Sequence, residues 1–131
     1  MRRLIPLAIA AVLLVGCKDA FTPSGVSGTY NLRTVNGEAL PYSETEFGTT
    51  FTYTAGSIVL RADGTYTMSA SVSWSDGEDS GTMTLTTSGT FTLTEPNTIT
   101  MTDSDGDSSA ATLDGGRITV TGDGYTYVFE K

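Results

Sequence analysis

The residue types that most catalytic sites need are scarce in this chain. It has 131 residues, no histidine and a single cysteine, Cys17. Serine and threonine are frequent, but a hydroxyl needs an adjacent base to act as a nucleophile, and no Gly-x-Ser-x-Gly motif is present. Aspartate and glutamate could form an acid–base pair, yet most of them lie at expected turns, where they favour turn geometry and solubility. We therefore expect a protein that is not an enzyme.

The most regular acidic group is Asp103, Asp105 and Asp107, spaced two residues apart around a loop at 104–106. In a hairpin with this loop Asp103 stands opposite Asp107, and like charges in that position repel each other. A weakly bound calcium ion would relieve the repulsion, because calcium prefers oxygen ligands. The spacing differs from that of an EF-hand. The simpler hypothesis, a solvated acidic turn with no cofactor, is favoured.

Apolar and aromatic residues form the other candidate site. From Ser27 onward they alternate with threonine and serine, which is the period of strands with one buried face. The predicted inner face carries no charge, and Arg33 and Arg61 fall on the outer face. A bound molecule would therefore be small and apolar. The candidate contact residues are Tyr53, Tyr66, Met68, Trp74, Phe91 and Tyr127. The alternative is that these side chains simply fill the core.

Turn residues between the alternating segments predict hairpins. Loop length fixes which residues face each other, and apolar residues should face apolar ones. The loop at 62–64 is expected to pair Leu60 with Tyr66, the loop at 95–97 Leu93 with Ile99, and the loop at 115–116 Leu113 with Ile118. The loop at 87–89 is expected to pair Leu85 with Phe91, the loop at 76–77 Ala70 with Met83, and the loop at 122–123 Val120 with Tyr125. No crossover is needed. The fold class is all-β: an antiparallel up-and-down meander of eight to ten strands that closes as a small barrel.

Threonine dominates the opposite face of these strands. The same loops pair Thr86 with Thr90 and Thr94 with Thr98, so the outer face carries a threonine array. Such an array could bind ice or sugar. Exposed strands use threonine commonly, however, so a plain solvated face is the favoured interpretation.

The first residues divide as a secretory signal does: Arg2 and Arg3, an apolar run at 4–15, and then Gly16 and Cys17. The apolar run is shorter than the roughly 20 residues that span a bilayer. Residues 14–17, Leu-Val-Gly-Cys, resemble the bacterial lipobox. That resemblance implies that Cys17 is acylated and becomes the first mature residue, whereas the alternative is a free thiol. The lipobox resemblance, with Lys18 as the residue after the cysteine, also implies an outer-membrane anchor that faces the periplasm.

We therefore expect a signal peptide at 1–16, a lipidated cysteine and short tether at 17–26, and a barrel domain at 27–131. Loss of the two signal arginines takes the net charge from −8 to about −10. Such a surface repels phosphate backbones, which argues against nucleic-acid partners. The predicted partners are the membrane, through the lipid, and a small apolar ligand.

Two segments near the start of the expected domain carry a family resemblance. Residues 27–32, Ser-Gly-Thr-Tyr-Asn-Leu, and 35–41, Val-Asn-Gly-Glu-Ala-Leu-Pro, resemble the opening of bacterial lipocalin-like secreted proteins, and residues 56–60, 63–66 and 125–129 fit the same rhythm. The resemblance implies a small barrel that holds an apolar ligand, and it offers no catalytic residue to carry over. The leading hypothesis is a lipid-anchored lipocalin-like binding protein of the envelope. The alternative is a non-binding structural or interaction module with a filled core.

Overall fold

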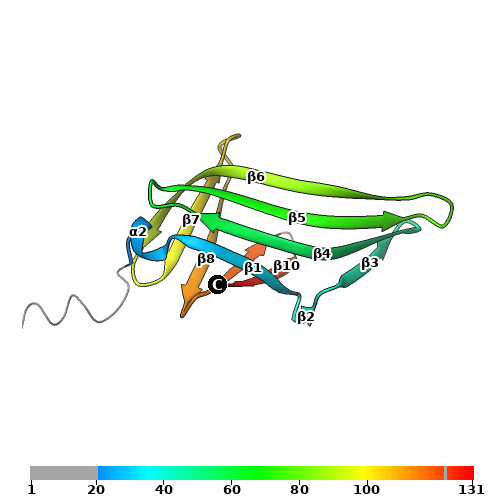
Figure 1. The fold of residues 1–131 in the computed structure, drawn as a ribbon, viewed down its shortest axis with the longest axis horizontal. Coiled ribbons are helices and arrows are strands. Elements are labelled where there is room, and N and C mark those ends of the chain that lie inside the picture. The colour runs from blue at the N-terminus through cyan, green and yellow to red at the C-terminus, as the bar shows by residue number, and fades with distance from the viewer. Residues whose placement is uncertain (1–20, 123) are drawn as a thin grey trace, which may run out of the picture.

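Eight strands close into a β-barrel, and a long sheet projects from one end of it (Figure 1). The computed structural model describes residues 21–122 and 124–131, so the predicted signal peptide, Cys17 and Asp123 lie outside the described residues. The barrel strands are β1 (Gly28–Val35), β4 (Thr49–Leu60), β5 (Thr65–Ser75), β6 (Ser80–Thr94), β7 (Thr98–Asp103), β8 (Ser108–Asp114), β9 (Arg117–Gly122) and β10 (Tyr125–Glu130). The elements outside the barrel are the helix α2 (Pro23–Val26) and the short strands β2 (Glu38–Ala39) and β3 (Tyr42–Glu46).

Antiparallel pairing runs around the barrel in chain order. Each strand from β4 to β10 pairs with the next, β10 pairs with β1, and β1 pairs with β4. This confirms the predicted all-β up-and-down meander that closes as a small barrel. Strand β2 pairs only with β1 and β3 only with β4, so these two strands leave the barrel wall. They belong to the irregular segment that begins at the tight turn Asn36-Gly37, where both residues have positive φ.

Three of the expected strand registers are confirmed. Residues that face each other across the loops are Leu60 and Tyr66, Leu93 and Ile99, and Leu113 and Ile118. In these places the loop length and the apolar alternation agree, because a slip by one residue would turn the apolar side chains outward.

The predicted turn at 87–89 is wrong. Strand β6 continues through it, so Leu85 lies opposite Ala70 and not opposite Phe91. Gly89 pairs with Tyr66 on one side and with Asp103 on the other. A Cβ added at Gly89 would lie 1.9 Å from the Thr102 carbonyl oxygen. Glycine is therefore present here because two backbones approach closely, and not because the chain reverses.

Two further registers differ from the prediction. The connection after β5 has four residues, 76–79, and the Asp76 carboxylate closes it by accepting the N–H groups of Glu78 (2.9 Å) and Asp79 (2.7 Å). Met83 consequently lies opposite Val72 instead of Ala70. At the last hairpin Val120 lies opposite Tyr127 and not Tyr125. The connection contains Gly124, which has a positive φ.

One end of the barrel is filled and covered. The largest fully buried side chains of the barrel are Tyr30, Val35, Ile58, Leu60, Ile99, Met101 and Ile118. Helix α2 covers this end: Val26 is buried, and the Tyr30 hydroxyl donates to the Val26 carbonyl at 2.6 Å. Phe21 also packs against this core, so the packed region begins before the predicted domain boundary at residue 27. We call this region the closed end.

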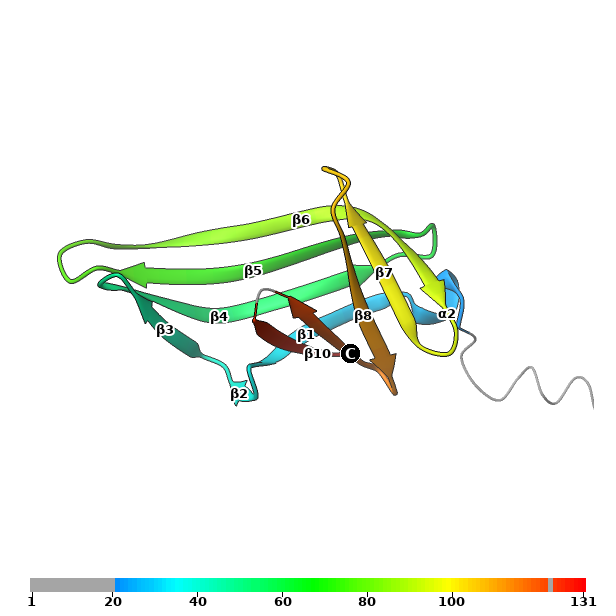
Figure 2. The ribbon, with the colours of Figure 1, turned by 180° about the vertical axis from the view of Figure 1, so that it is seen from behind.

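The other end is open because the strands differ in length. Strands β4, β5 and β6 have 12, 11 and 15 residues, whereas β7 to β10 have six or seven. The outer parts of the long strands, with β3 beside them, extend past the barrel as what we call the arm, residues 42–53 and 72–83 (Figure 2). No helix among the described residues is long and apolar enough to cross a membrane.

Candidate ligand-binding site

A pocket of about 210 Å³ lies where the barrel opens toward the arm. It draws side chains from five barrel strands, which the closure of the barrel brings together. The lining residues are Leu32, Tyr53, Met68, Ser69, Ala70, Leu85, Thr87, Tyr127 and Phe129. Most of this lining is apolar, and no charged side chain contributes to it. Leu85 is 48% exposed, which is unusual for a large apolar side chain on the inner face of a barrel.

A second hollow of about 300 Å³ adjoins this pocket. Met68, Thr87 and Tyr127 line both hollows, so the two lie side by side. The second hollow extends past Tyr66 and Val120 to the turn between β7 and β8. There Asp103 and Asp107 are among its lining residues. We call the two hollows together the mouth groove.

Four tyrosines stand at the arm side of the mouth groove. The rings of Tyr42 and Tyr53 are neighbours on β3 and β4, with centroids 6.3 Å apart. Tyr53 lies 6.3 Å from Tyr127 of β10 at an interplanar angle of 56°. Tyr127 stacks on Tyr125 at 5.9 Å and 10°. The four rings form a continuous row, the tyrosine row, in which Tyr53 and Tyr127 also line the pocket.

Glu44 is the charged group beside the tyrosine row. Its carboxylate accepts a hydrogen bond from the Tyr125 hydroxyl, which links β3 to β10 across the mouth. This bond holds the pKa of Tyr125 well above its ordinary value of 10. Burial, followed by hydrogen bonding with Tyr53, raises the pKa of Tyr127 in the same direction. Both phenols therefore stay protonated at neutral pH.

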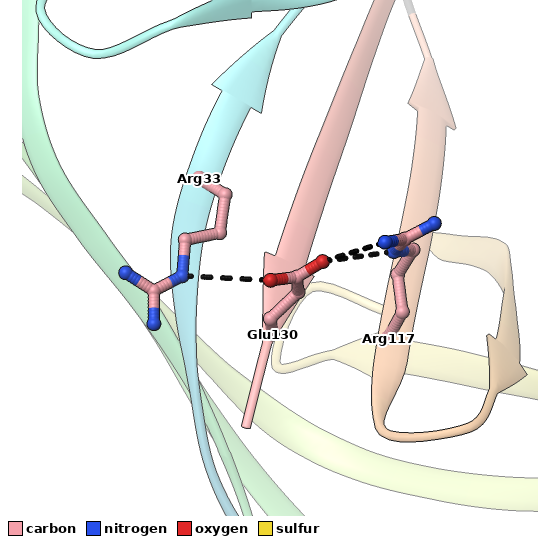
Figure 3. A network of polar contacts seen from close by, with 3 residues as sticks. All are labelled: Arg33, Arg117 and Glu130. Atoms are coloured by element: carbon pink, nitrogen blue, oxygen red, sulfur yellow. Dashed lines mark hydrogen bonds and ion pairs between the residues drawn. The ribbon is translucent and has the colours of Figure 1, made fainter.

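Basic side chains lie elsewhere. Figure 3 shows Glu130 between two arginines on the outer face: the Arg117 Nη2 atom is 2.8 Å and the Arg33 Nε atom 3.8 Å from its carboxylate oxygens. Arg61 donates to the Thr67 hydroxyl at 2.8 Å, also outside the barrel. The Lys131 ammonium lies 5.5 Å from the Tyr30 ring, at the closed end. None of these four, the basic residues of the described part, lines the mouth groove.

The structure brings together some of the predicted ligand contacts and separates others. Tyr53, Met68 and Tyr127 line the first pocket, and Tyr66 lines the second hollow. Phe91 lines neither, because it lies beyond Gly89 in the closed end and is 4% exposed. Trp74 lies on the arm over Gly81 and borders a separate shallow groove lined mainly by serine and threonine.

Several lining residues were absent from the predicted contacts. Leu32 and Phe129 follow the same inward alternation, so the pattern could have supplied them. Ala70 and Leu85 lie opposite each other on β5 and β6, but the wrongly predicted turn at 87–89 paired Leu85 with Phe91 instead. Glu44 carries no local signal, because its contact with Tyr125 joins residues 81 positions apart.

The acidic turn has a structural use for its first carboxylate. Asp103 Oδ1 accepts the N–H groups of Asp105 at 2.9 Å and Asp107 at 3.0 Å, and the Asp103 N–H donates to the Asp107 carbonyl at 2.9 Å. Within residues 21–122 and 124–131, no three metal-ligating side chains gather as they would around an ion. Asp103 therefore stabilises the turn itself, and calcium binding at Asp103, Asp105 and Asp107 stays a prediction.

The threonine array is present on the outer face with a changed register. Thr94 lies opposite Thr98 as expected. Thr86 lies opposite Ser69 and not Thr90, because β6 has no turn between them.

Comparisons with known proteins add no family. No protein-family model, no curated protein and no solved structure matches this chain. The resemblance to lipocalin-like proteins therefore remains a prediction, and the case for a function rests on the geometry of the mouth groove.

Proposed function

We propose that this protein is a lipid-anchored, lipocalin-like component of the cell envelope that binds a small apolar molecule in the mouth groove. The observation that carries the proposal is the mainly apolar pocket of about 210 Å³ at the open end of an otherwise filled barrel. An apolar cavity of about 150 Å³ is large enough to bind benzene. The pocket is thus suited to a ring or a short alkyl chain.

Exposed apolar side chains support binding. Leu85 in the pocket and Met83, the next inward residue on the arm, are 48% and 37% exposed. Covering apolar surface is favourable by about 25 cal/mol per Å². A ligand that covered Leu85, Ala70 and Met68 would gain this free energy without any change in the closed end.

The position of the first described residues supports an anchor at Cys17. The described chain begins at Phe21, next to α2 at the closed end, and the arm lies at the far end of the molecule (Figure 1). A lipid attached at Cys17 would therefore hold the closed end near the membrane and leave the mouth groove open to solvent. Several acyl chains on one cysteine would make that attachment stable.

The pocket can be tested by filling it. We expect isothermal titration calorimetry to detect 1-hexanol binding to the mature protein, and Ala70→Trp to abolish it, because the new ring occupies the space beside Leu85. Ala110→Trp makes the same change at an exposed outer position and should bind 1-hexanol as the parent does. Absence of binding to the parent protein would instead favour the non-binding envelope module, and equal binding by the two variants would place 1-hexanol outside this pocket and overturn the assignment.

The anchor is tested separately. Cells expressing the full chain and fed an alkyne analogue of palmitate should label the protein, and Cys17→Ser should remove the label and release the protein from the membrane fraction. Persistent membrane association of the unlabelled variant would contradict the lipid anchor while leaving the pocket unaffected.

A further inference from the structure

Among the described residues, the charged ones that line the mouth groove are Asp103 and Asp107. Glu44 lines neither hollow, but its carboxylate accepts from Tyr125, whose ring stacks on the groove residue Tyr127. Glu46 lies close enough to raise the pKa of Tyr125 further, although the hydrogen bond to Glu44 has the larger effect. The basic residues of the described part lie on the outer face or at the closed end. The carboxylates would repel an anionic head group that entered the groove.

The tyrosine row adds an attraction that depends on ligand charge. Ring faces attract cations through their quadrupole, and cages of aromatic rings recognise quaternary ammonium groups in this way. Tyr53 and Tyr127 are inclined at 56° with centroids 6.3 Å apart, so they form two walls that are not parallel. Tyr42 and Tyr125 extend the walls on either side. The charged group bonded to this row is the Glu44 carboxylate, which accepts from the Tyr125 hydroxyl.

We propose that the mouth groove selects a cationic amphiphile, with its alkyl or aromatic part in the pocket and its ammonium group between the tyrosine row and Glu44. The two parts are continuous, because Tyr53 and Tyr127 belong to both the pocket lining and the tyrosine row. This inference rests on the proposed function and adds the charge of the ligand to it.

A quaternary ammonium fits these groups better than a primary amine. The trimethylammonium group has no N–H to donate, so it needs only ring faces and a nearby negative charge. Both Glu44 oxygens already accept from the Tyr125 hydroxyl, yet the carboxylate keeps its charge and further lone pairs. Binding therefore does not require the link between β3 and β10 to break.

Three probes of equal chain length separate the inference from the function on which it rests. In calorimetry at low salt, hexyltrimethylammonium should bind the mature protein about tenfold more tightly than 1-hexanol, the order of one strong cation–π contact. Hexanoate should bind more weakly than 1-hexanol. If the protein binds 1-hexanol but binds hexyltrimethylammonium no more tightly, or binds hexanoate best, the inference is overturned and the proposed function stands. If none binds, both fall.

Matched variants locate the preference. Glu44→Gln removes the charge and keeps an acceptor for Tyr125, so the ratio of cation to alcohol affinity should fall about fivefold. Glu95→Gln makes the same change in the β6–β7 connection, remote from the groove, and should leave the ratio unchanged. An equal effect of both variants would show a response to net charge alone and would overturn the assignment.

A substitution of Tyr127 tests how much the aromatic rings contribute to the preference for the cation. Tyr127→Leu keeps an apolar wall but removes the ring between Tyr53 and Tyr125, so the preference for the cation should fall toward equality. Tyr53→Leu tests the same wall from β4 if the first variant melts below the measuring temperature. A preference that survives in every folded variant would contradict recognition by the tyrosine row.

Discussion

The closed end and the arm share β4, β5 and β6, yet they differ in what lies over the inner faces of these strands. At the closed end, β1 and β7 to β10 complete the barrel, and Ile58 and Ile99 are wholly buried. On the arm the same inner face continues with Val72, which is 4% exposed, and with Met83, but the six- and seven-residue strands do not reach Met83. Met83 remains 37% exposed.

This difference shows that alternation defines a face but does not determine whether that face is covered. The period of two is the same in both regions. Strand length decides the outcome, because a long strand opposite short ones presents apolar residues without a partner. The mouth groove lies where the two regions meet, so the packed half can hold the fold while the open half remains available for binding.

The largest expected effect concerns the point where β6 enters the closed end. Gly89→Ala places a methyl group against the Thr102 carbonyl oxygen, and we expect a loss of about 3 kcal/mol or more in the free energy of unfolding. Urea unfolding followed by circular dichroism measures it. Gly122→Ala, where an added Cβ meets no atom within 4 Å, should change stability by less than about 0.5 kcal/mol. Equal effects of the two substitutions would contradict the close backbone approach at Gly89 and would favour a turn at residues 87–89.

Truncation of one side chain in each region tests the packing contrast. Ile58→Ala at the closed end should cost about 3 kcal/mol, because it leaves a cavity in a filled core. Met83→Ala on the arm should cost less than about 1 kcal/mol, since its side chain already contacts solvent. Chemical denaturation of the two variants gives both values. A larger cost at Met83 would mean that the arm is covered in solution.

Alkaline pH should destabilise the mouth groove. The raised pKa of Tyr127 keeps its proton in the folded state where the unfolded chain loses it near pH 10. Its contribution to stability is therefore fully present below pH 10 and is lost as the pH rises above it. We expect the melting temperature to fall above pH 10 and to fall less steeply in Tyr127→Phe. If the melting temperatures of the parent and Tyr127→Phe fell equally steeply with pH, the Tyr127 hydroxyl would be exposed to solvent in the folded protein.

The sequence predicted the architecture well where turns and alternation agree. The loop at 62–64 has a local basis: Asp63 Oδ1 accepts from the Thr65 N–H at 3.0 Å and from its hydroxyl at 2.7 Å. The error at 87–89 arose because Thr-Ser-Gly is a turn sequence in isolation. A glycine that admits a neighbouring backbone cannot be distinguished from a left-handed glycine until the neighbour is known.

The candidate site was predicted only in part for a related reason. Inward positions such as Met68 and Tyr127 follow from alternation. Which of them face a groove depends on relative strand lengths, and this placed Phe91 in the core and Trp74 on the arm. The contact of Glu44 with Tyr125 depends on barrel closure, which no local pattern of residues specifies.

A methyl-resolved NMR titration with 1-hexanol tests the contrast between the two regions most directly. The methyl signals of Met68, Ala70 and Leu85 should shift with saturation, while those of Ile58, Ile99 and Ile118 at the closed end stay within the linewidth. No shift at any methyl, or equal shifts in both groups, would contradict a filled half that supports an open binding half.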